Sequence, residues 1–340
     1  MRPGFAGPAL NYTGQMRRLF LGAILAGAIA IAAGAGWWLW RQKQNERFLF
    51  RRLPGENSLL LYLDMNKLRR SEALLPLVRS QVDPDPDYAA FVRQTGFDYQ
   101  RDLDEAAVCY LADRVYVLAR GRFDEPRLSE YAAAQGGSCA GGGVSGKTRV
   151  CWMPASRPDR KISFFILSPG VLALATAPEP DAVLQLEVLP VPSAEPLAQA
   201  AAARSKGMAL LWATAAPPAL DRLLSETGGG VSPNLLLLSR ALAAAQRAYL
   251  LLMDRSPNLE LSLQAVCASE AQAGELRRLL QGLNDLIGGL LRGPASKGPP
   301  SDWGRLLASA VIAQNQNTVT ATWTLDQSIL RNFGPAQGAR

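Results

Sequence analysis

The segment from Gly141 to Thr148 has the residue types of a phosphate-binding loop. Its sequence matches the pattern GxxxxGK[ST], with Gly141, Gly146, Lys147 and Thr148 at the defining positions. In such a loop the backbone amides surround the phosphates, the lysine reaches the β- and γ-phosphates, and the hydroxyl binds Mg²⁺. That geometry needs a strand before the loop and a helix after it. Here a helical pattern precedes the loop and a strand pattern follows it, so we expect a flexible helix-to-strand turn and no bound cofactor.

The chain contains no histidine. Imidazole is the base of Ser-His-Asp and Cys-His systems, a common zinc ligand, and part of the iron-binding facial triad. Those sites are therefore excluded, and an enzyme built on this chain would need paired carboxylates, lysine or a bound nucleotide. We expect a protein that is not an enzyme.

Two acidic clusters have residue types that could hold a cation or transfer protons. The run Asp83-Pro-Asp-Pro-Asp87 begins like a calcium loop, but an EF-hand needs Gly at its sixth position and Glu at its twelfth, where this chain has Tyr88 and Gln94. The second cluster, Asp98–Glu105, precedes a predicted hairpin. Because Asp favours turns and helix N-termini, we expect both clusters to be structural, with no metal site.

Four cysteines divide into two pairs. Cys109 and Cys267 lie among apolar neighbours in predicted strands, so we expect buried thiols. Cys139 and Cys151 flank the glycine loop and could form a disulfide in an oxidising compartment. Their spacing alone leaves open whether the two Cα atoms come close enough to be bridged.

A long uncharged segment, residues 19–40, predicts a transmembrane helix. Its length, at about 1.5 Å of rise per residue, is enough to cross a hydrocarbon core of about 30 Å. Trp37, Trp38 and Trp40 lie at its end, where aromatic rings favour the membrane interface. Within it a small residue recurs at every fourth position. These residues are Gly22, Ala26, Ala30 and Gly34. Such a pattern lets two helices approach closely and predicts a homodimer. The alternative is that the spacing only reflects the high Gly and Ala content of the span.

The orientation of this segment has conflicting signals. Arg17-Arg18-Leu-Phe-Leu21 resembles the core of a twin-arginine export signal, and Ala33-Gly-Ala35 has the form of a cleavage site. The apolar run continues to Trp40, however, which favours an uncleaved anchor. More basic residues follow the span than precede it, which favours the reverse orientation. We expect a single-pass bacterial inner-membrane protein with its N-terminus in the cytoplasm and its C-terminal domain in the periplasm.

The basic charge of the chain is concentrated beside this span. Residues 1–52 carry a net charge of +7, which equals the net charge of the whole chain, so residues 53–340 are neutral overall. Basic residues close to a span match topology signals and anionic headgroups. We therefore expect the lipid bilayer and an envelope protein as partners, and no nucleic acid.

Beyond the span, the hydrophobic patterns predict an α+β fold made of two tandem units, each of mostly antiparallel sheet with helices packed on one face. Each unit has a strand, a helix, a hairpin, a further helix and returning strands. The repeat rests on element order alone. The expected organisation is a basic tail (1–18), the transmembrane helix (19–40), a basic juxtamembrane segment (41–52), a first unit (53–189), a proline-rich linker (190–196), a second unit (197–334) and a tail (335–340).

A set of short motifs occurs in the first unit. Phe91, Thr95-Gly96, Asp98 and Asp102-Leu-Asp104 are followed by Gly121-Arg-Phe123 at the end of a predicted hairpin strand. This set resembles that of uncharacterised bacterial single-pass membrane-anchored proteins. The resemblance covers the first unit and implies no known activity.

These observations predict a membrane-anchored, non-enzymatic binding or scaffolding protein of the bacterial envelope. One alternative is an assembly-platform component of a secretion or pilus system, where one span and an α/β module also occur together; this is an architectural analogy. A second alternative is a nucleotide-dependent enzyme that uses the Gly141–Thr148 loop.

Overall fold

The computed structural model describes residues 47–74, 86–143, 148–226, 242–292, 306 and 309–326. Leu49–Arg340 forms one compact unit, which begins directly after Phe48. The expected membrane helix at 19–40, with its stripe of small residues, lies outside the described residues. Among the helices that are described, none has both the length and the apolar character needed to span a bilayer.

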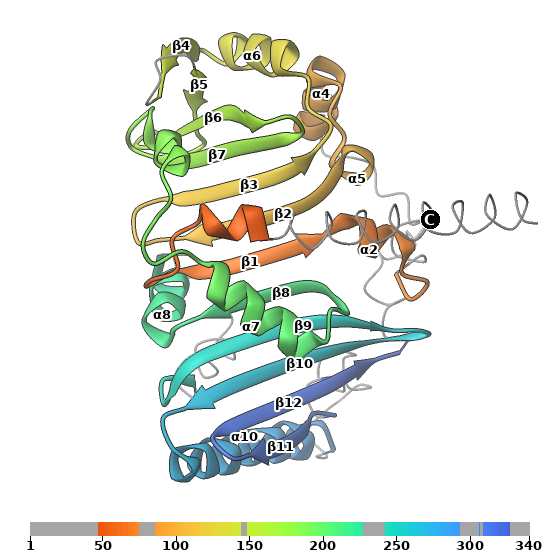
Figure 1. The fold of residues 1–340 in the computed structure, drawn as a ribbon. Coiled ribbons are helices and arrows are strands. Elements are labelled where there is room, and N and C mark those ends of the chain that lie inside the picture. Colours follow the sequence, from red (N-terminus) through yellow and green to blue (C-terminus); the bar gives the residue numbers. More distant parts are fainter. Residues whose placement is uncertain are drawn as a thin grey trace, which may run out of the picture. The chain divides into compact units, whose positions relative to one another are not determined.

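In the part of the chain that the structure describes, twelve strands form one sheet in which every neighbouring pair is antiparallel (Figure 1). The α+β class expected from the sequence is confirmed at this level. In spatial order the strands are β11 (Val311–Asn315), β12 (Thr318–Leu325), β10 (Asn258–Cys267), β9 (Ala245–Arg255), β8 (Ala209–Ala215), β1 (Leu59–Asp64), β2 (Leu103–Tyr110), β3 (Val115–Gly121), β7 (Val171–Ala177), β6 (Lys161–Ser168), β5 (Thr148–Pro154) and β4 (Ser138–Gly142).

The two sequence halves meet at the centre of this sheet. We expected a sheet in each half, but β1 pairs with β2 on one side and with β8 on the other, so that Leu61 faces both Val108 and Ala213. Outward from β1 the order is β2, β3, β7, β6, and outward from β8 it is β9, β10, β12, β11. The strand order is therefore the same in both halves, and β5 and β4 extend only the first.

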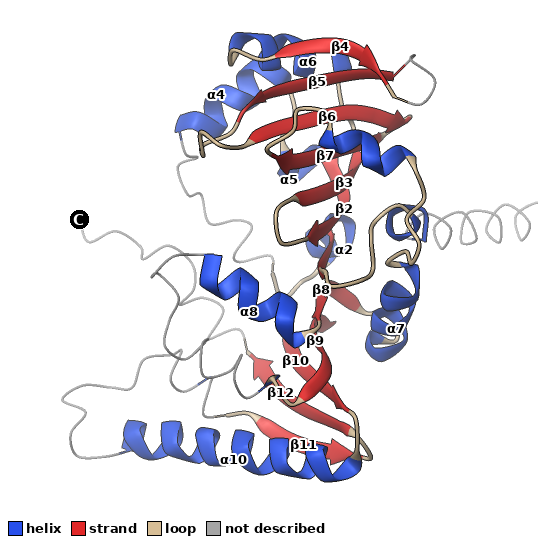
Figure 2. Ribbon diagram, turned by 90° about the vertical axis from the view of Figure 1, so that its left-hand side faces the viewer, coloured by secondary structure: helices blue, strands red, loops and turns tan. Residues whose placement is uncertain are grey.

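Helices cover both faces of the sheet, so the expectation of one covered face is wrong. Arg204 lies over the ring of Tyr249, 4.4 Å from its centroid, whereas the next residue, Leu250, packs in a cluster with Leu276 and Leu280. Consecutive residues of a strand point to opposite faces. Figure 2 accordingly shows α7 on one side of the sheet and α8 and α10 on the other. The longer helices are α4 (Pro86–Thr95), α6 (Glu125–Ala134), α7 (Glu195–Ser205), α8 (Pro217–Glu226) and α10 (Glu270–Arg292).

The expected juxtamembrane segment contributes to the core at its C-terminal end. Leu49 is 0% exposed and Phe50 is 1% exposed. The Phe50 ring lies 5.0 Å from that of Trp212 and 5.7 Å from that of Tyr62, measured between centroids. Basic residues dominate the sequence of this segment, but its apolar residues pack into the core and fix the position of its C-terminal end. The folded unit thus begins at Leu49.

The proline-rich segment 190–196 is bonded to the chain that precedes β1. The amide of Ala194 donates to the carbonyl of Leu53 at 2.7 Å, and the amide of Gly55 donates to the carbonyl of Pro192 at 3.1 Å. Residues 195 and 196 already belong to α7, a helix that the sequence patterns did not predict.

Helix starts follow the sequence better than helix ends do. Asp124 accepts a hydrogen bond from the amide of Arg127 at 3.1 Å and caps α6, and the amide of Gln272 donates to the hydroxyl of Ser269 at 3.3 Å at the start of α10. Asp and Ser are preferred at such positions because their side-chain oxygens accept hydrogen bonds from the free amides of the first turn. α2 (Met65–Arg70) is short and ends at Ser71, whose backbone is extended.

Candidate functional site

The structure brings the first-unit motifs together at the ends of β2 and β3. α4 ends at Thr95, whose hydroxyl donates to the carbonyl of Phe91 at 2.8 Å and accepts from the amide of Phe97 at 3.2 Å. Gly96 follows with a φ of +72°, the left-handed conformation that ends many helices. The chain then turns into α5 (Tyr99–Asp102), which leads directly into β2.

Asp98 fixes the start of α5. Its carboxylate accepts a hydrogen bond from the amide of Gln100 at 2.9 Å and from the hydroxyl of Tyr88 at 2.9 Å. Burial and this bond raise the pKa of Tyr88 to about 12, so the phenol is neutral. Asp98 therefore acts as the helix cap that its sequence position predicted.

Asp102 is the charged centre of the site. Its side chain is 8% exposed. The carboxylate accepts hydrogen bonds from the amide of Asp98 at 2.9 Å, from Nη2 of Arg101 at 3.0 Å and from Nη2 of Arg122 at 2.9 Å. The bond from Arg101 is the largest cause that lowers the pKa of Asp102, to about 2, against the opposing effect of burial; the Asp98 amide and Arg122 lower it further. Asp102 is thus ionised near neutral pH and is unsuited to act as a general acid.

Gly121 lets the end of β3 approach this carboxylate. A Cβ atom at Gly121 would overlap the carbonyl oxygen of Asp102. The same carbonyl accepts from the amide of Arg122 at 2.9 Å, and the amide of Gly121 donates to the carbonyl of Gly170 at 2.9 Å. Glycine is needed at this position because the backbones of residues 102 and 121 lie too close together to leave room for a side chain.

Aromatic rings connect the ends of β2 and β3 to α4 and α6. The rings of Phe97 and Phe123 are stacked, with centroids 5.0 Å apart and planes 24° apart. Phe91 contacts Phe97 and Tyr131 edge-on, with centroids at 6.4 Å and 5.1 Å. α4 and α6 are therefore packed together over the same motif.

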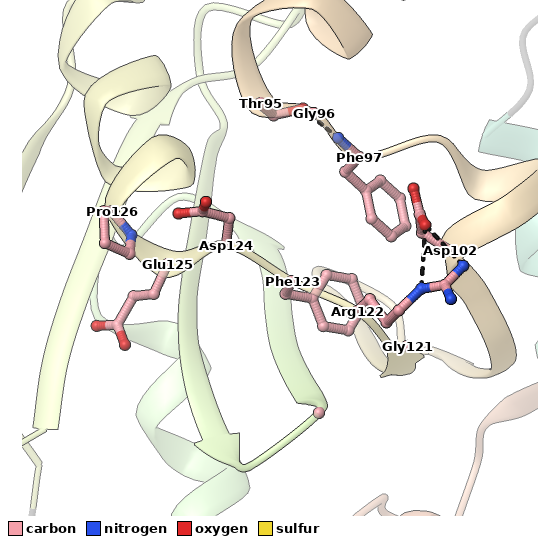
Figure 3. A pocket seen from close by; sticks show the side chains of 11 residues that line it. Thr95, Gly96, Phe97, Asp102, Gly121, Arg122, Phe123, Asp124, Glu125 and Pro126 are labelled. Atoms are coloured by element: carbon pink, nitrogen blue, oxygen red, sulfur yellow. Dashed lines mark hydrogen bonds and ion pairs between the residues drawn. The ribbon is translucent and has the colours of Figure 1, made fainter.

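An open surface depression with a volume of about 640 Å³ lies between these groups. Figure 3 shows Asp102 and Arg122 bonded at one end, the two phenylalanines beside them, and Asp124, Glu125 and Pro126 at the other end. The volume lies within the range of small-ligand sites. Among the lining residues the structure describes, the Asp102 and Arg122 charges neutralise each other. Among these described lining residues there is no activated nucleophile, and the depression is open to solvent.

The glycine loop has the context of a β-hairpin. β4, which the sequence patterns did not predict, precedes it, and β5 follows it, with Gly142 paired to Thr148. Gly141 lies within β4, and the Thr148 hydroxyl bonds the Glu187 carboxylate. The preceding element is thus a strand where we expected a helix. Gly146 and Lys147 lie outside the described residues. A strand after the loop, with a carboxylate at the threonine, does not provide the helix N-terminus on which a phosphate loop depends.

The structure joins Cys139 and Cys151 in a disulfide between directly paired positions of β4 and β5. Cys109 and Cys267 are buried thiols. Burial raises the pKa of Cys109 to about 12 and raises that of Cys267, so neither is a thiolate near neutral pH.

The acidic run from Asp83 to Asp87 is only partly described. Asp87 lies in the first turn of α4, where a negative charge favours the helix. Asp83 and Asp85 lie outside the described residues. In the part of the chain that the structure describes, no group of three or more Cys, Asp or Glu is arranged to hold a metal ion.

A buried polar cluster that the sequence patterns missed lies beside the site. The hydroxyl of Tyr62 donates to the carboxylate of Glu105 at 2.7 Å, and Arg120 pairs with the same carboxylate. Glu105 and Arg120 are partners across β2 and β3. This pair could have been predicted from the sequence, because an acidic and a basic residue occupy facing positions of the predicted hairpin.

Comparison with known proteins adds little to this description. No family model matches the chain, and no curated protein matches it. Two solved structures of the protein TP0453, crystal forms I and III, resemble the fold at 10% identity with TM-scores of 0.42 and 0.44. Each covers 84% of this chain, and the likeness extends over 95% and 96% of those chains. A structural similarity this low says nothing about the function of the chain, which is therefore inferred from its own residues.

Proposed function

We propose that this chain is a binding or scaffolding protein of the bacterial envelope, anchored in the inner membrane by residues 19–40, with the unit from Leu49 onward in the periplasm. The proposal names no enzymatic activity. Its partner is a protein of the same compartment.

The observation that carries the proposal is the disulfide between Cys139 and Cys151. Disulfides persist in oxidising compartments and are rare in the reducing cytosol. The remaining thiols, Cys109 and Cys267, are shielded by the core. This division of the four cysteines supports an exported unit, in agreement with the export signals before residue 40.

The candidate site supports binding in preference to catalysis. Asp102 is held ionised by two guanidinium groups, and Asp98 and Asp124 cap helices. The open depression beside them has stacked aromatic rings in its lining. Aromatic side chains and arginine are the residues most enriched where proteins bind one another.

Labelling from outside tests the location of the unit. Ala133 is exposed on α6, so the variant Ala133→Cys adds one accessible thiol to the buried Cys109 and Cys267. A membrane-impermeant maleimide should label this variant in intact spheroplasts and leave the parent chain unlabelled. Labelling that occurs only after lysis would place the unit in the cytoplasm and overturn the proposal.

A further inference from the structure

The segment Val188–Pro192, here called the apolar loop, exposes consecutive apolar residues. It connects η1 (Ala182–Glu187) to the start of α7 and has the sequence Val-Leu-Pro-Val-Pro (Figure 1). The exposed fractions are 59% for Val188, 51% for Leu189 and 97% for Val191. Single exposed apolar residues are common, but a consecutive run on a surface signals an interaction.

The structure holds the loop at both ends. Before it, Ala182, Val183 and Leu186 of η1 are buried in the core. At its end, Pro192 accepts a hydrogen bond from the amide of Gly55, and just beyond it Ala194 donates one to the carbonyl of Leu53. The three exposed side chains therefore project from a fixed base, which reduces the entropy that would be lost when they are buried.

Basic residues adjoin the loop. Nη1 of Arg52 donates to the carbonyls of Leu186 at 3.1 Å and Glu187 at 3.2 Å. Arg51 has a side chain that is 60% exposed and lies 3.6 Å from the Glu195 carboxylate. Exposed apolar side chains next to arginine are the combination that binds the interface of a membrane with anionic lipids.

Chain connectivity favours the bilayer as the surface that covers the loop. Fewer than ten residues separate Trp40, the end of the expected span, from Leu49, the start of the folded unit. Fully extended, that stretch reaches roughly 30 Å. Pro192 at the end of the loop accepts a hydrogen bond from Gly55, and Ala194 just beyond the loop donates one to Leu53, so the loop is held to the residues that follow closely after Leu49.

We propose that Val188, Leu189 and Val191 insert into the interfacial region of the membrane in which the chain is anchored. The apolar loop is a second membrane contact beside the span. This inference rests on the proposed membrane anchor, and it adds a surface of the folded unit that the anchor alone does not require.

The test uses the full chain reconstituted into vesicles of phosphatidylethanolamine and phosphatidylglycerol. The variant Val191→Cys carries the environment-sensitive fluorophore NBD, and Ala133→Cys with the same label is the matched control. The parent chain, treated identically, corrects for labelling of Cys109 and Cys267. Flotation first establishes whether the chain is bound to the vesicles, and lipids with a nitroxide at a shallow acyl position then quench any fluorophore that contacts them.

We expect the chain to float, the emission at position 191 to shift to the blue, and nitroxide lipid to quench most of it, with position 133 unshifted and unquenched. A chain that floats while position 191 stays unquenched overturns the loop contact and leaves the anchor standing. A blue shift at position 191 without nitroxide quenching identifies a protein contact and also overturns it. A chain that does not float overturns both the anchor and the loop contact.

Discussion

The Arg122 guanidinium holds the Asp102 carboxylate through Nη2 at 2.9 Å and through Nε at 3.1 Å, and so fastens the end of β3 to the start of β2. Both residues belong to short motifs that are separated by a whole hairpin in the sequence. Their pairing gives those motifs a structural role, because it joins the ends of β2 and β3 and forms one side of the open depression.

Replacing Asp102 with asparagine should destabilise the fold. The substitution removes a nearly buried charge that accepts bonds from two arginines, and hydrogen bonds to charged groups contribute about 1.5–3 kcal/mol each. We expect the free energy of unfolding to fall by about 2 kcal/mol, measured by urea denaturation. The control Asp159→Asn removes exposed ion pairs to Arg157 and Arg160 and should change stability by less than about 1 kcal/mol. Equal effects of the two substitutions would contradict the role assigned to Asp102.

The contribution of Asp102 should depend on pH in a defined direction. Its pKa in the folded chain is about 2, below the ordinary value of 3.8, so the folded state binds this proton more weakly than the unfolded state does. The stabilisation is therefore complete above the unfolded pKa and disappears as pH falls from about 4 to about 2. The stability difference between the parent chain and Asp102→Asn should be constant from about pH 7 to 5 and shrink below about pH 4. A difference that grows on acidification would contradict this sign.

Two glycine-to-alanine substitutions should have opposite effects. At Gly121 a Cβ atom overlaps the backbone of Asp102, which cannot move without disturbing the pairing of β2 with β3, so we expect a loss of about 1–3 kcal/mol. At Gly282, in α10, a Cβ atom meets nothing within 4 Å. Alanine is the better helix former by about 0.5–1 kcal/mol, so Gly282→Ala should stabilise the chain. Denaturation midpoints of the two variants check both signs, and a neutral Gly121→Ala would show that the close approach is not needed.

Phe50 should be essential to the fold although it follows a segment dominated by basic residues. It is 1% exposed and packs on Tyr62 and Trp212, so Phe50→Ala should cost about 3–5 kcal/mol. The neighbouring Arg51→Ala removes an exposed ion pair and should cost less than about 1 kcal/mol. Thermal unfolding of the two variants compares them directly. A mild effect of Phe50→Ala would place the start of the folded unit after residue 52, as the sequence pattern alone suggested.

The sequence predicted elements whose signals are local. Runs of apolar residues predicted a strand, a hairpin and returning strands in each half. Asp98 marked a helix start through a side chain that accepts a hydrogen bond from a nearby amide. β4 was missed because its Ser-Cys-Ala-Gly-Gly sequence has no apolar alternation, and it is positioned by pairing with β5.

Long-range pairing escaped the sequence patterns. Leu59–Leu63 is apolar on both faces, and nothing in that pattern states that β8 would be its second neighbour. For the same reason, the candidate site could be predicted only in part from the sequence. Helix caps could be predicted from spacing, whereas the bond from Arg122 to Asp102 depends on the register of β2 and β3.

The central claim is that the unit is exported and contains the disulfide between Cys139 and Cys151. The oxidation state of the cysteines in the native protein tests this claim most directly. Membranes are collected with free thiols blocked by iodoacetamide, and the purified chain is digested without reduction and analysed by mass spectrometry. The account predicts that the Cys139 and Cys151 peptides are linked, and that Cys109 and Cys267, alkylated once the chain is denatured in the blocking reagent, are recovered singly. Four alkylated cysteines would contradict the disulfide and, with it, the assignment of this unit to an oxidising compartment.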